Sequence, residues 1–180
     1  MSTWTEPDVF YAQLAAFHAT TAALITEAGT GRILLVKPVY KDAWAWPGGY
    51  LDAGEYPHDG CTREVAEELG LKISPGQLLL VDFALPAGKR QRALINMLFD
   101  CGELPADTPI RLREDELSTW AFLTEDEAAE RLPAAERHRV AAAVRARRTG
   151  LTTYLPGFRR DCDPLHRPVG HRVGRPTAFG

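Results

Sequence analysis

Three glutamates, Glu64, Glu67 and Glu68, lie within five residues near the middle of this 180-residue chain. On a helix, positions three or four apart share a face, so Glu64 neighbours the other two. Their like charges would destabilise an isolated helix by about 0.2–0.5 kcal/mol per pair. A divalent cation such as Mg²⁺ relieves this repulsion, because it prefers oxygen ligands and keeps several waters for a substrate's phosphates. The cluster therefore predicts a metal site for phosphate chemistry.

A solvated helix face with ordinary charge pairs is the alternative interpretation of these glutamates. Such a face usually intersperses lysines, and the segment from Gly49 to Leu71 contains none. A solvated face also leaves unexplained the paired glycines Gly48 and Gly49, at a fixed distance before Glu55. We therefore favour the metal site.

The elements around the cluster are those that a metal site needs. A helix is expected over residues 57–69, where Cys61, Val65 and Leu69 follow the i, i+4, i+8 spacing of a core-facing side and Gly70 suits the C-terminal cap. The glycines before the helix permit close approach of the backbone to a ligand.

Loop and helix are expected to be joined by an ion pair between Glu55 and Arg63.

From Gly49 to Leu71 the chain resembles the Nudix box of the Nudix hydrolase family. The pattern is Gly, five residues, Glu, seven residues, Arg-Glu, an aliphatic residue, any residue, Glu-Glu, any residue, Gly and an aliphatic residue. Every fixed position is filled, by Gly49, Glu55, Arg63, Glu64, Val65, Glu67, Glu68, Gly70 and Leu71. A looser resemblance extends over about residues 18–145.

The resemblance implies hydrolysis of a nucleoside diphosphate linked to another moiety, with Mg²⁺ or Mn²⁺ as the metal. The implied metal ligands are the Gly48 carbonyl, Glu64, Glu67 and Glu68. The three glutamates would also supply catalytic groups, with Glu68 our first choice as ligand and the general base left open. The positions implied to be structural are Gly49, Glu55, Arg63 and Gly70.

Further candidate residues lie outside the box. Glu114 and Glu116 precede an expected strand at residues 119–123, where relatives often carry another acidic metal ligand or base; a solvated loop is the equal alternative. The candidate substrate contacts are Lys37, Tyr40, Trp46, Phe83 and Arg92. For Lys37 and Tyr40 the alternative is a solvated loop, and for Trp46 the alternative is packing in the core.

The order of expected elements favours an α/β fold, a Nudix-like α/β/α sandwich with a mixed β-sheet. Strands are expected at residues 20–26, 32–39, 43–46, 77–85, 92–101 and 119–123, with further helices at 124–131 and 134–148. We divide the chain into an N-terminal extension at 1–17, a Nudix hydrolase domain at 18–150 and a Pro/Gly-rich basic tail at 151–180.

Charge and composition bound the possible partners. Residues 1–130 hold 10 Lys and Arg against 21 Asp and Glu, whereas residues 131–180 hold 11 Arg against 3 Asp and Glu. A basic segment could contact nucleic acid, but a surface arm that complements the acidic body is the commoner explanation. No apolar run is long enough for a membrane span, and three scattered cysteines favour a cytoplasmic protein.

The expected substrate is a small nucleotide, of the ADP-ribose, nucleotide sugar or nucleoside triphosphate type. One alternative is a nucleotide-sensing or partner-binding Nudix module without turnover. Another is an RNA 5′-end pyrophosphohydrolase, motivated by the basic C-terminal segment. Because relatives are often dimers, a homodimer is possible.

Overall fold

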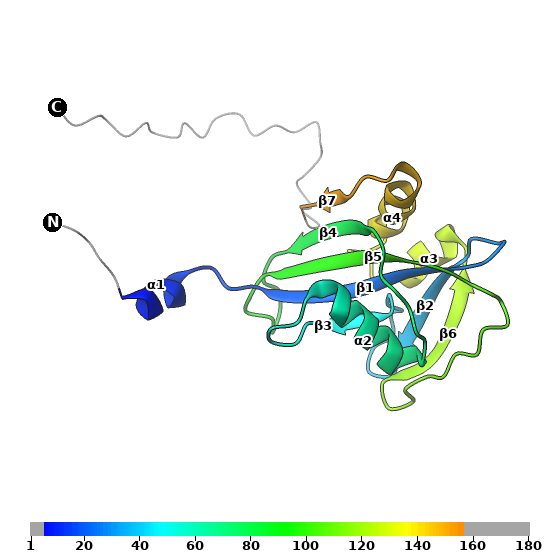
Figure 1. Ribbon diagram of the computed structural model, residues 1–180, viewed down its shortest axis with the longest axis horizontal. Helices are drawn as coiled ribbons and strands as arrows, with labels where there is room; N and C mark the ends of the chain where they lie inside the picture. The colour runs from blue at the N-terminus through cyan, green and yellow to red at the C-terminus, as the bar shows by residue number, and fades with distance from the viewer. Residues whose placement is uncertain (1–5, 157–180) are drawn as a thin grey trace.

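The computed structural model describes residues 6–156 (Figure 1). Its elements, in chain order, are α1 (Pro7–Gln13), β1 (His18–Glu27), β2 (Ile33–Pro38), β3 (Gly48–Tyr50), α2 (Pro57–Leu69), β4 (Leu78–Ala84), β5 (Leu94–Leu104), β6 (Leu117–Leu123), α3 (Glu125–Arg131), α4 (His138–Thr149) and β7 (Thr153–Leu155).

The strands form one 7-stranded mixed sheet in the order β6-β2-β1-β5-β4-β7, with β3 paired to β1 beside this path. The β1–β5 and β4–β7 pairs are parallel, and the other strand pairs are antiparallel. The central strand β1 therefore connects β3, which begins the Nudix box, to β5 in the middle of the sheet.

Helices cover both faces of the sheet, and each face has its own apolar core. Successive side chains of a strand point to opposite faces, so Leu24 packs in the core beneath α3 and α4, whereas Ala23 and Ile25 pack with α2. Figure 1 shows α2 lying across the sheet. The α/β sandwich with a mixed sheet is confirmed.

Helix α2 has the predicted bounds. Cys61, Val65 and Leu69 are fully buried in the core, as their spacing predicted. Gly70 ends the helix in the left-handed conformation, with φ 65°. The side of α2 that carries Cys61, Val65 and Leu69 therefore packs on the sheet, and the side that carries Glu64 and Glu67 lies at the edge of this contact.

Two parts of the sheet differ from the expectation. The strand expected at residues 43–46 is only a single bridge between Val36 and Ala45. Strand β3 instead forms from the predicted loop, because Gly48 and Gly49 pair with Ala22 and Thr21 of β1.

The sheet also continues past residue 150. Strand β7 pairs with β4 from within the segment assigned to the tail, and Thr152 Oγ1 donates a hydrogen bond to the Leu78 carbonyl, 2.6 Å away. The rest of that segment, residues 157–180, lies outside the described part of the chain. Between residues 6 and 156, none of the helices has the length and apolarity to span a bilayer.

Candidate active site

Arg63 joins the loop of the box to its helix. Its Nε and Nη2 donate hydrogen bonds to the two carboxylate oxygens of Glu55, each at 2.9 Å, and Nη2 also donates to the Tyr50 carbonyl at 3.1 Å. These hydrogen bonds from Arg63, together with one from the Asp52 backbone N–H, lower the pKa of Glu55 to about 2. The ion pair predicted from the sequence is confirmed and fixes the loop against α2.

Glu68 is the most enclosed carboxylate of the box, with 8% of its surface exposed. Its Oε2 accepts a hydrogen bond from the Gly48 N–H at 2.8 Å. Burial raises the pKa of Glu68 to about 7; this hydrogen bond lowers it, while the charges of Glu64 and Glu116 raise it further. A carboxyl whose pKa is strongly shifted by burial and by neighbouring charges is typical of a functional site.

Glu64 lies against the paired glycines. Its Oε1 accepts a hydrogen bond from Arg63 Nη1 at 3.0 Å. A Cβ placed on Gly49 would lie 2.5 Å from that same oxygen, so a larger residue there would displace the Glu64 carboxylate. Burial raises the pKa of Glu64; Arg63 opposes this rise, and the charges of Glu67 and Glu116 add to it.

Glu67 is more exposed and is shared between two arginines. Its Oε2 lies 3.5 Å from Arg63 Nη1 and 3.7 Å from Arg113 Nη1. Arg113 Nη1 is also 3.2 Å from Glu116 Oε1, which links the loop before β6 to α2. Of the two acidic candidates in that loop, Glu116 is brought to the cluster, whereas Glu114 is exposed to solvent.

The cluster fits a divalent cation by its chemistry, although its ligands are not gathered. Within residues 6–156, no three His, Cys, Asp or Glu side chains form a ready metal cluster. Gly48 contacts the cluster through its N–H, and Glu64 and Glu67 pair with arginines. Yet the charge of Glu116 disfavours ionisation of both Glu64 and Glu68, and the charge of Glu64 disfavours ionisation of Glu68. An oxygen-rich set with excess negative charge is what a hard cation requires.

Tyr40 lies in the field of the same cluster. Partial desolvation of its hydroxyl raises the pKa of Tyr40, and the charges of Glu68 and Glu116 raise it further. The ring itself is exposed. Lys37 Nζ donates to the carbonyls of Lys41 and Asp42, so its ammonium holds the loop that carries Tyr40.

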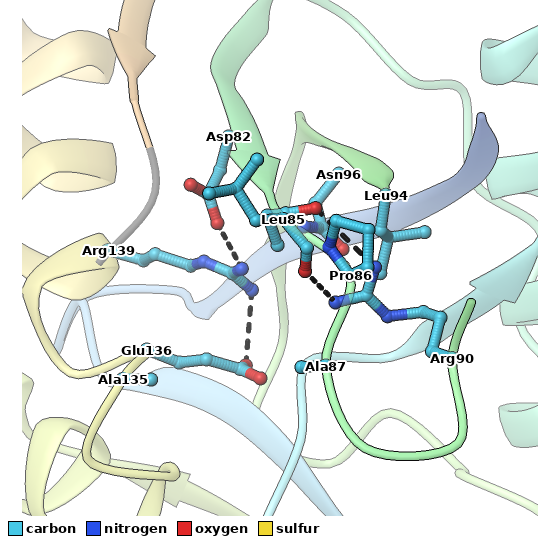
Figure 2. Close-up of a pocket in the computed structure, with 11 residues that line it drawn as sticks. Asp82, Leu85, Pro86, Ala87, Arg90, Leu94, Asn96, Ala135, Glu136 and Arg139 are labelled. Atoms are coloured by element: carbon cyan, nitrogen blue, oxygen red, sulfur yellow. Dashed lines mark hydrogen bonds and ion pairs between the residues drawn. The ribbon is translucent and has the colours of Figure 1, made fainter. Parts of the chain in front are cut away.

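A cavity of about 500 Å³ opens on the other face of the sheet, between the ends of β4 and β5 and the start of α4. Figure 2 shows Asp82, Asn96 and Arg139 turned toward it, with Pro86 and Arg90 on its loop side. A small pocket adjoins it and extends to Thr20 and Trp46.

Of the predicted substrate contacts, Trp46 lines this smaller pocket. Phe83 packs edge-on against Phe17, with ring centroids 5.5 Å apart, and does not line either cavity. Arg92 is exposed, and its carbonyl accepts a hydrogen bond from Arg90, the arginine that does line the larger cavity. The larger cavity is lined by Asp82 and Ala84, on either side of Phe83, and by Arg90, two residues before Arg92.

Asp82, Asn96 and Arg139 were not among the residues predicted from the sequence. A signal for the first two was present, because Asp82 is the one charged residue in the strand LLLVDFA and Asn96 interrupts the apolar run LINMLF. Such residues seldom face a dry core unless they are paired. Arg139 offered no comparable signal among the many arginines that follow residue 130.

The sequence and the fold were compared with those of known proteins, and a family model matches most of the chain. The family model described as NUDIX domain matches residues 16–143. A MutT-like protein of Streptomyces ambofaciens is 27% identical over 115 residues, which cover 64% of this chain and 70% of that protein. An RNA pyrophosphohydrolase of Psychrobacter sp. is 38% identical over 63 residues, 35% of this chain and only 36% of that protein.

Among solved structures, the MutT protein of Methanosarcina mazei Go1 superposes with a TM-score of 0.63. It is 24% identical, and the match covers 74% of this chain and 96% of that one. At 24% identity this likeness shows that the two proteins share a fold.

Proposed function

The chain belongs to the Nudix family, and on that basis we propose that it is a Mg²⁺-dependent pyrophosphohydrolase. Its substrate would be a nucleoside diphosphate linked to another moiety. The observation that carries the proposal is the complete box with its carboxylates at one site, where the enclosed Glu68 has a pKa raised to about 7 by burial and by its acidic neighbours.

The roles follow from the surroundings of each side chain. Glu64, Glu67 and Glu68 would hold the metal, with the Gly48 backbone beside them. When bound, a divalent cation neutralises phosphate oxygens and lowers the pKa of an attacking water. A carboxylate of the cluster accepts that water's proton. Glu116 belongs to this proposed set, because its charge acts on both Glu64 and Glu68.

The test is a substrate panel with Mg²⁺ present. The panel contains ADP-ribose, nucleotide sugars, dinucleoside polyphosphates, nucleoside triphosphates and a 5′-triphosphorylated RNA, the last because of the short match to an RNA pyrophosphohydrolase. Glu68→Gln should lower kcat on the best substrate by about 10²-fold or more. Glu103→Gln, at an exposed glutamate of β5, is the matched control and should leave kcat unchanged.

The same substitution has a predicted effect on stability that separates lost chemistry from lost folding. The pKa of Glu68 rises from about 4.3 in the unfolded chain to about 7 in the fold. Its contribution to stability is therefore complete below about pH 4.3 and is lost as the pH rises through 7. At pH 8 without metal, Glu68→Gln should be more stable than wild type by about 4 kcal/mol, measured by urea unfolding.

Wild-type turnover that survives exhaustive EDTA treatment would contradict the metal role. If instead the wild type binds a nucleotide of the panel tightly and forms no product with Mg²⁺ or Mn²⁺, the alternative of a nucleotide-sensing module replaces the proposal.

A further inference from the structure

Four buried side-chain atoms that have no hydrogen-bond partner within residues 6–156 belong to residues that line the two adjoining cavities. They are Trp46 Nε1, Asp82 Oδ1, Asn96 Nδ2 and Arg139 Nε. Buried polar groups in native proteins are nearly always paired, and each exception calls for an explanation. Because Asp82, Asn96 and Arg139 line both cavities, a single ligand is the simplest partner for these atoms.

The sheet places three of the polar residues in one row. Thr20 of β1 is the register partner of Asn96 in β5, which is in turn the partner of Asp82 in β4. Their side chains therefore point to the same face, toward α4. The Thr20 hydroxyl donates to Asn96 Oδ1 at 2.7 Å. This bond uses one lone pair of the amide oxygen, while the Nδ2 donor of the same amide has no partner in the described part of the chain.

Helix α4 completes the site. Arg139 pairs with Asp82 Oδ2 and lies 3.2 Å from Glu136 Oε2, as Figure 2 shows. Asp82 is 3% exposed, and Arg139 is its ion-pair partner. The other carboxylate oxygen, Oδ1, has no donor within residues 6–156. Removing a charged pair from water is costly, and a ligand that uses both members accounts for its presence here.

The pattern of free groups specifies a ligand chemistry. Trp46, Asn96 and Arg139 offer N–H donors, and Asp82 offers one acceptor. A carbonyl oxygen has two lone pairs and can accept from two donors. Three donors and one acceptor on the protein therefore favour a ligand edge on which a carbonyl oxygen lies next to an N–H. Guanine and uracil present this edge, whereas adenine carries an amino group and no carbonyl.

We propose that these cavities form a base pocket that binds an oxo-nucleobase, of the guanine or uracil type, of the nucleotide substrate. This inference rests on the proposed function and names the substrate class of that site. The space of about 500 Å³ lies within the range of small-ligand sites.

The base pocket is connected to the carboxylate cluster through one short segment. Trp46 forms its wall, and Gly48, two residues later, donates its N–H to Glu68. In an extended segment these two residues are about 6.6 Å apart along the backbone. A base beside Trp46 would therefore lie next to the segment that carries Gly48.

The test measures binding without turnover. Metal-free protein is titrated with GMP, UMP, AMP, CMP and ribose 5-phosphate, and binding is followed by NMR. The reporter is the indole N–H signal of Trp46, identified by its loss in Trp46→Phe. GMP or UMP should bind about tenfold more tightly than AMP and ribose 5-phosphate and should shift this signal.

Two pocket variants and one matched control complete the design. Asn96→Leu and Asp82→Asn should each weaken binding of the preferred nucleotide by about tenfold. Gln77→Met removes another buried amide that lacks a partner, one that lines neither cavity, and should leave the affinity unchanged. If Asp82→Asn does not fold, Asn96→Leu decides the question, because Asn96 carries no charge.

The inference is overturned if AMP or ribose 5-phosphate binds as tightly as GMP and UMP, or if Asn96→Leu retains wild-type affinity. Absence of any shift at Trp46 also overturns it, and then bound water satisfies the four atoms. Failure of the proposed function has a different outcome: base preference by NMR persists, but no substrate of the panel is hydrolysed.

Discussion

The carboxylates of the box are chemically alike, and their surroundings divide them into two kinds. Glu55 faces the guanidinium of Arg63, which lowers its pKa to about 2 and keeps it ionised. Glu68 is enclosed beside other acids, and its pKa rises to about 7. The first carboxylate therefore serves as a permanent charge that holds a loop. The second is poised to change its charge or to bind a cation, which is the property that a reactive site needs.

The Glu55–Arg63 pair predicts a pH dependence of stability. The pKa of Glu55 is about 4.3 in an unfolded chain and about 2 in the fold. Its contribution to stability is therefore present above about pH 4.3 and is lost as the pH falls toward 2. Glu55→Gln should be less stable than wild type at pH 7, and this difference should shrink between pH 4.5 and 2.5, as measured by urea unfolding. A gap that stays constant over this range would contradict the assignment.

At the scale of elements, β3 sets the position of the whole site, and its close contact with β1 requires a glycine. Gly48 has φ +138°, and a Cβ there would overlap the carbonyl oxygen of Thr21. Gly48→Ala should therefore destabilise the protein by about 3 kcal/mol. It should also lower activity, because the N–H that binds Glu68 is displaced. Gly54→Ala is the control, since Gly54 has φ +82° but open space around it; it should cost about 1 kcal/mol and retain activity.

The predictability of each element depended on whether its signals were local. Helix α2 was predicted with its observed ends, because Pro57 and Gly70 mark them within the helix's own sequence. Strand β3 was missed, because glycine weakens strands and the pairing with β1 is a tertiary contact. The box carboxylates were found from spacing alone.

The base pocket was not found in the same way. It brings together Asp82, Asn96 and Arg139 from two strands and a distant helix, and no spacing along one chain segment encodes that meeting.

At the scale of the whole molecule, the charge asymmetry of the sequence has a structural use. Two arginines of α4 pair with acids of the sheet: Arg139 with Asp82, and Arg147 with Asp100, whose Oδ2 accepts from Nε at 2.9 Å. Arg147 also donates to Thr26 Oγ1 at 2.9 Å. For these residues, the basic C-terminal part complements the protein's own acidic body, the explanation favoured over nucleic-acid binding.

The end of the folded domain can be tested with two truncations. A chain ending at Pro156 retains β7, whereas one ending at Gly150 loses its pairing with β4 and the bond from Thr152 to the Leu78 carbonyl. It also loses Leu155, which packs against the core. The shorter chain should therefore be less stable by about 2 kcal/mol in urea unfolding. Equal stability of the two truncations would restore the domain boundary at residue 150, because the pairing of β7 with β4 would then add no stability.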